Sequence, residues 1–197
     1  MRARRNALDA TDASSSVSIR RLALALVLLA PAAASASEAV FSAGAPSCDL
    51  PAGADDCAAA FLATATALGC TDEDLCDVRV TGAADGRGTR AGDRDLRLAF
   101  GVVSSPAPAP PLFLVEVCTA RSLAASAPGS LACSGESGTL AVAMEPGACA
   151  RLVVQARYVT TLLPRNAIVN VVHGLETATA VAEAPFCNAG DGTATIG

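Results

Sequence analysis

Residues 151–158 read Arg-Leu-Val-Val-Gln-Ala-Arg-Tyr, a run in which every second side chain is apolar. Leu152, Val154, Ala156 and Tyr158 alternate with residues that include both arginines and the glutamine. A period of two is the period of a β-strand, which presents successive side chains to opposite faces of its sheet. The run therefore predicts a strand with one face on a core and the other toward solvent.

Comparable runs lie on both sides of this one. Alternating strands are predicted at residues 96–102, 140–144 and 177–183, and nearly continuous apolar strands at 112–117 and 167–173. The alanine content of residues 177–183 would also suit a helix. Short strands separated by turn-forming residues are typical of sandwiches and barrels, here closed by disulfides. The sequence thus predicts a mainly β chain, with a disulfide-stabilised β-sandwich-like domain over residues 79–197.

Residues 37–78 differ in charge from the rest, since they hold eight acids and no base. A helix is predicted from Cys57 to Leu68, with Asp55 or Asp56 as N-cap and Gly69 at the C-cap. Cys57, Phe61, Ala65 and Leu68 would share one helical face, because they are spaced by four and three. This segment is therefore expected to be an acidic, helical, cysteine-rich cap.

Residues 1–36 resemble a leader. Arg20 and Arg21 precede the apolar run 22–30, and Ala34-Ser35-Ala36 supplies a small-residue cleavage site. These features predict a signal peptide cleaved after Ala36, and hence a secreted or extracytoplasmic protein, extracellular or periplasmic. The apolar run is shorter than the ~18 residues of a membrane span, so no span is expected after signal removal.

Eight cysteines follow the predicted leader: Cys48, Cys57, Cys70, Cys76, Cys118, Cys133, Cys149 and Cys187. An even number behind a signal peptide predicts four disulfides. A helix over 57–68 would hold Cys57 and Cys70 too far apart to bond. The first four cysteines would then pair as 48–57 with 70–76 or as 48–70 with 57–76, and we favour the second because it ties both helix ends to loops.

Catalytic candidates are few. The run Cys133-Ser134-Gly135-Glu136-Ser137-Gly138 resembles the nucleophile segment of chymotrypsin-like serine proteases, and the resemblance would make Ser137 a nucleophile. Such a serine needs a base within reach. The sole histidine, His173, follows Ser137, whereas the histidine of that family precedes the serine. We favour the interpretation of this run as a polar hairpin loop before the strand at Leu140, so no catalytic residue is assigned beyond the weak candidates Ser137 and His173.

Metal ligands are also sparse. Asp72, Asp74 and Asp77 are weak candidates for calcium, whose preferred ligands are oxygens, but their spacing matches no common calcium loop. A solvated acidic loop accounts for the same residues. The sequence therefore predicts neither a metal site nor a cofactor.

Charge excludes one class of partner. The leader holds five of the 14 basic and two of the 19 acidic residues, so the chain after residue 36 carries a net charge of −8. That charge repels phosphate, and no nucleic-acid partner is expected. The sequence predicts a secreted, disulfide-stabilised binding or structural protein with an unknown protein or surface partner. A small secreted hydrolase using Ser137 and His173, or a secreted inhibitor or effector, are the alternatives.

Overall fold

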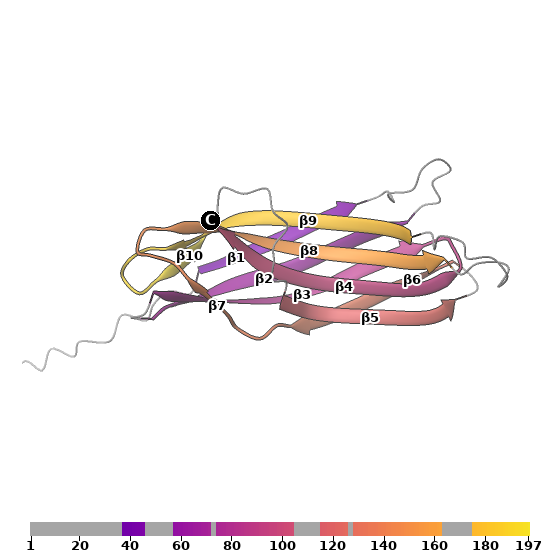
Figure 1. Ribbon diagram of the computed structural model, residues 1–197, viewed down its shortest axis with the longest axis horizontal. Helices are drawn as coiled ribbons and strands as arrows, with labels where there is room; N and C mark the ends of the chain where they lie inside the picture. Colours follow the sequence, from indigo (N-terminus) through magenta and orange to yellow (C-terminus); the bar gives the residue numbers. More distant parts are fainter. Residues whose placement is uncertain (1–36, 46–56, 72–73, 105–114, 126–127, 163–174) are drawn as a thin grey trace, which may run out of the picture. The chain divides into compact units, whose positions relative to one another are not determined.

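The computed structural model describes residues 37–45, 57–71, 74–104, 115–125, 128–162 and 175–197 (Figure 1). These residues form ten strands: β1 (Ser37–Ala45), β2 (Ala58–Cys70), β3 (Leu75–Gly88), β4 (Gly92–Ser104), β5 (Val115–Ala125), β6 (Gly129–Glu136), β7 (Leu140–Ala143), β8 (Cys149–Leu162), β9 (Leu175–Asn188) and β10 (Ala194–Ile196). The predicted mainly β class is confirmed. In the described ranges, no helix is long and apolar enough to cross a membrane.

The strands form two five-stranded antiparallel sheets. Sheet I has the order β1-β2-β3-β6, with β7 also paired to β3, and sheet II has the order β10-β9-β8-β4-β5. Figure 1 shows β9, β8, β4 and β5 in one layer and β1, β2, β3 and β6 in the other. Buried residues from both sheets form one core. β3 continues through residues 78 and 79, where the sequence analysis divided the cap from the domain.

Most of the strands predicted from sequence lie within strands of the structure. Those at 96–102, 140–144, 152–158 and 177–183 lie on β4, β7, β8 and β9 and are confirmed, apart from Met144, which follows the end of β7. From Val115 onward, the run 112–117 lies in β5. The run 167–173 lies outside the described residues.

The helix predicted from Cys57 to Leu68 is wrong, because residues 58–70 form β2. The reason lies in the spacing. Residues 57, 61 and 65 are four apart, which satisfies a helical face and also places all three on one face of a strand. The exposure of Leu68 distinguishes the strand from the helix. In a helix Leu68 would lie on the buried face with these residues, but its side chain is 41% exposed. Alanines 59, 63, 65 and 67 complete the buried face of β2.

The core combines small side chains with large ones. β2 contributes mainly alanine, whereas sheet II contributes Phe100, Leu152, Tyr158 and other large side chains that are fully buried. Gly86 on β3 is required by this packing, because a Cβ there would lie 2.4 Å from Cδ2 of Tyr158. The Tyr158 ring therefore crosses from sheet II to fill space that sheet I leaves open.

Disulfides connect strands within and between the sheets. Cys70–Cys76 joins β2 to β3, Cys118–Cys133 joins β5 of sheet II to β6 of sheet I, and Cys149–Cys187 joins β8 to β9. Cys57 is also disulfide-bonded. The favoured pairing of 48–70 with 57–76 is wrong, because Cys70 and Cys76 lie opposite each other in the β2–β3 register and bond together. Cys48 lies outside the described residues.

Candidate functional site

Ser137 lies between two strands that share one edge of β3. β6 pairs with residues 81–88 of β3 and β7 with residues 75–78. In the gap between them, the Ser137 N–H donates to the Val80 carbonyl at 2.9 Å, and the Val80 N–H donates to Ser137 Oγ at 3.0 Å. The residue is only 6% exposed. Ser137 thus continues the backbone pairing of β3 across the gap.

Replacing Ser137 with alanine is expected to destabilise the fold by about 1–3 kcal/mol, since it leaves the buried Val80 N–H without its acceptor. Urea denaturation measures this loss. Ser134→Ala, an exposed change on the neighbouring strand β6, is the control and is expected to have little effect. Equal stabilities of the two variants would contradict the structural role of the Ser137 hydroxyl. His173 lies outside the described residues, so the pairing of Ser137 with His173 stays a prediction.

The calcium candidates lie in different local settings. Asp74 occupies a turn with a φ of 59°, and Asp77 lies on strand β3. Asp72 lies outside the described residues. Among the described residues, no group of three or more His, Cys, Asp and Glu side chains is arranged to hold a metal ion. The calcium site therefore stays a prediction.

A second carboxylate, Asp191, lines a hollow together with Asp74. The Thr193 hydroxyl and backbone N–H both donate to Asp191, and these hydrogen bonds lower the pKa of its carboxyl. Both donors belong to Thr193, two residues along the chain, so the Asp191 carboxylate stabilises the turn in which it lies. This geometry explains the carboxylate without a ligand.

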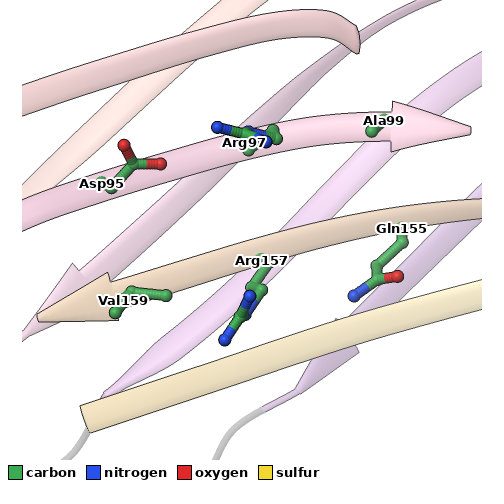
Figure 2. A pocket seen from close by; sticks show the side chains of 6 residues that line it. All are labelled: Asp95, Arg97, Ala99, Gln155, Arg157 and Val159. Atoms are coloured by element: carbon green, nitrogen blue, oxygen red, sulfur yellow. The ribbon is translucent and has the colours of Figure 1, made fainter. Parts of the chain in front are cut away.

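The outer face of sheet II places polar side chains together on its two central strands. The inward residues of β4 and β8 are buried in the core, so the residues between them face outward. Asp95, Arg97 and Ala99 of β4 lie opposite Val159, Arg157 and Gln155 of β8, respectively. These six residues line a hollow of about 350 Å³ (Figure 2). We call it the arginine hollow.

Charge in and around the arginine hollow is largely paired. The ion pairs on this face include Arg121 Nε to Asp95 Oδ2 at 2.6 Å, Arg97 Nε to Glu116 Oε2 at 3.6 Å, and Arg151 Nη1 to Glu183 Oε2 at 2.8 Å. Arg157 takes part in no hydrogen bond or ion pair with any residue the structure describes. Among the described residues, the lining of the hollow therefore carries a net charge of +1, from Arg97, Arg157 and Asp95.

Arg157 also lies directly opposite Arg97 in the β4–β8 register. Like charges at opposed positions destabilise a sheet. Figure 2 shows the Arg157 side chain extending toward β9, away from Arg97, as repulsion between the guanidinium groups favours. The fold thus keeps an unfavourable pair at the centre of a sheet.

The hollow is suited to binding. Two guanidinium groups and the Gln155 amide supply hydrogen-bond donors, while Ala99 and Val159 supply short apolar walls. The six lining residues include no serine, cysteine or histidine, and the one carboxylate, Asp95, is engaged by Arg121. Their arrangement can hold an acceptor but offers no nucleophile paired with a base.

The outer face of sheet I is different. Its central depression is lined mainly by small residues, among them Ala63, Gly82 and Ala83. Leu62 on its rim is 60% exposed, and Val40 on the neighbouring strand is 71% exposed. This face combines apolar surface with the Thr64, Thr81 and Ser134 hydroxyls, and Arg79 on it is paired with Glu136.

The residues that form the arginine hollow are not recognisable as a site from the sequence alone. Arg97 and Arg157 are 60 positions apart, and each lies at an outward position of a correctly predicted strand. The register that opposes them is set by packing of the two strands, which a single sequence does not display. The available signal was the placement of Gln155 and Arg157 at outward positions of residues 151–158.

Comparison of the chain with known protein families, curated proteins and solved structures finds no match.

Proposed function

We propose that this chain is an exported, disulfide-stabilised binding protein that uses the arginine hollow of its β-sandwich as its binding site. Residues 1–36 would act as the signal peptide. The described disulfides support the extracytoplasmic assignment, because multiple disulfides are typical of proteins in oxidising compartments. The partner would be a protein or surface component carrying a group that the hollow accepts.

One observation carries the binding role: the opposed pair Arg97 and Arg157 at the centre of sheet II. Binding sites commonly retain groups that lower the stability of the free fold. Arg151 on the same strand is paired with Glu183, whereas Arg157 has no partner among the described residues and faces a like charge on β4. The opposed arginines are better explained by a partner outside the chain.

This proposal makes Arg157→Gln a stabilising or neutral change. Relief of like-charge repulsion across two strands is worth about 0.2–1 kcal/mol. Arg151→Gln on the same strand removes an exposed ion pair and is expected to cost about 0–1 kcal/mol. Arg87→Gln, on the outer face of sheet I, controls for the change in net charge, because Arg87 is exposed.

Urea denaturation of the three variants at low ionic strength measures these differences. Arg157→Gln should have the highest unfolding midpoint of the three. A midpoint below those of Arg151→Gln and Arg87→Gln would show that Arg157 supports the fold, and would contradict its assignment to a binding site.

A further inference from the structure

We propose that the arginine hollow binds an oxyanion, a carboxylate or sulfate group, between the guanidinium groups of Arg97 and Arg157. This inference rests on the proposed function and names the chemical class of its ligand. It follows from the register of β4 and β8, the charge of the residues that line the hollow, and the size of the hollow.

The register brings the two donors to neighbouring positions. Opposed residues in an antiparallel pair have Cβ atoms about 4.5–5.5 Å apart, and an arginine side chain reaches well beyond that spacing. Gln155 lies two residues before Arg157 and so faces the same side of β8. Its amide adds a third donor beside the pair. A group with several acceptor oxygens can therefore be held by both strands at once.

The charge of the residues that line the hollow favours an anion. Asp95 is engaged by Arg121, and Arg97 meets Glu116 through a long contact of 3.6 Å. Since Arg157 has no such partner among the described residues, the hollow is positive, although the whole chain has a formal net charge of −5. An oxyanion between the arginines would replace their repulsion with charge-assisted hydrogen bonds. The two parallel N–H donors of a guanidinium group match a pair of oxygens on one oxyanion.

The movement required is small. Arg157 is exposed and its side chain extends toward β9 (Figure 2). Because no residue in the described ranges holds Arg157, a change of rotamer would bring its guanidinium over the hollow without breaking an interaction. The Arg97 side chain is 49% exposed and is held only by its 3.6 Å contact with Glu116.

The volume of the hollow limits the size of the ligand. About 350 Å³ lies at the lower end of the range of about 300–1,000 Å³ for small-molecule sites. It accommodates an anionic group with a short attached body, such as one acidic sugar unit. Ala99 and Val159 would contact the apolar side of that body.

Thermal unfolding with three probes tests the inference: sodium sulfate, sodium acetate and sodium glucuronate, each compared with sodium chloride at equal ionic strength. At a probe concentration of about 100 times Kd, linkage predicts a rise in Tm of roughly 5–10 °C for the wild-type protein. Titration of the shift gives Kd for each probe. Sulfate and acetate test a free anion, and glucuronate tests the carboxylate on a sugar.

Variants separate binding from general salt effects, because sulfate stabilises many proteins by exclusion from their surface. Arg157→Gln is expected to weaken binding by about 10–100-fold, the worth of a charge-assisted hydrogen bond. Arg157→Lys is expected to weaken it less, since it keeps the charge but loses the fork of donors. Arg87→Gln should bind as the wild type does.

Gln155→Glu provides an internal test. A carboxylate at this position would lie beside both arginines and act as a built-in oxyanion. This variant is expected to have a higher Tm than the wild type and no further response to the probes. A lower Tm for Gln155→Glu would contradict the inference.

The outcomes distinguish this inference from the proposed function. Shifts that equal those in chloride, or shifts of the same size in wild type and Arg157→Gln, would overturn oxyanion binding. If Arg157→Gln nevertheless has the highest urea midpoint of its set, the binding role of the hollow stands with a different ligand class. If Arg157→Gln has the lowest midpoint, both proposals fall.

Discussion

Replacing Tyr158 with alanine is expected to lower the free energy of unfolding by about 3–5 kcal/mol, as other large aromatic truncations in cores do. Tyr158 is fully buried on β8, and its ring lies against Gly86 of β3. It therefore fills the space between the sheets at a point where sheet I has no side chain. The surrounding residues cannot close that space, because Gly86 contributes no atoms beyond its backbone.

The Tyr158 hydroxyl contributes separately. Thr160 Oγ1 donates to Tyr158 Oη at 3.1 Å, and both residues are fully buried. Tyr158→Phe keeps the ring and is expected to cost only about 1–3 kcal/mol, the penalty for leaving Thr160 without its acceptor. Chemical denaturation of both variants, with Tyr158→Phe combined with Thr160→Val as a second control, separates ring from hydroxyl. Equal losses for Tyr158→Ala and Tyr158→Phe would contradict the packing of the ring between sheets.

Removal of the Cys149–Cys187 disulfide, by alanine at both positions, is expected to cost about 4 kcal/mol. This bridge spans 38 residues, compared with 15 for Cys118–Cys133 and six for Cys70–Cys76. A cross-link restricts the unfolded chain more when it closes a longer loop, so the other two removals are expected to cost about 3 and 2 kcal/mol.

Urea denaturation of the three double-alanine variants tests this order. The wild-type protein under reducing conditions gives the combined loss of these three bridges and of the disulfide at Cys57. If removal of Cys70–Cys76 cost the most, the stabilisation would come from the local β2–β3 pairing and not from loop closure. That result would contradict the expected order.

Strands with clear alternation were predictable from sequence. Residues 151–158 alternate apolar with polar side chains, and β8 buries Leu152, Val154, Ala156 and Tyr158 as predicted. The same holds for residues 96–102 in β4. In these runs every inward position is apolar and all but Ala156 are large, so the period of two is visible without knowledge of the partner strands.

Strands built from small residues were not predictable in this way. Alanine occurs at both inward Ala59 and outward Ala60 of β2, so hydrophobicity does not mark the faces. β3 holds Asp85, Gly86 and Arg87, which favour a loop by composition, and glycine is needed there only because Tyr158 approaches from the other sheet. The run 133–138 was interpreted as a hairpin loop because it is rich in glycine and serine, but its first four residues belong to β6.

The candidate site depended still more on tertiary structure. The sequence shows Arg97 and Arg157 as separate outward residues, and their opposition arises from the β4–β8 register. The absence of a partner for Arg157 within the described ranges is likewise a property of the packed face. Ser137 was singled out by a local motif, but the role that the structure shows for it is a hydrogen bond to Val80 on another strand.

The claim that this chain is an exported, disulfide-stabilised protein is tested most directly by mass spectrometry of the exported material. The protein is alkylated under denaturing conditions without reduction, weighed intact and then digested. We expect an N-terminus at Ser37, no alkylated cysteine, and peptides linked through Cys70–Cys76, Cys118–Cys133 and Cys149–Cys187. Alkylated thiols at any of these six positions, or a chain that retains residues 1–36, would contradict it.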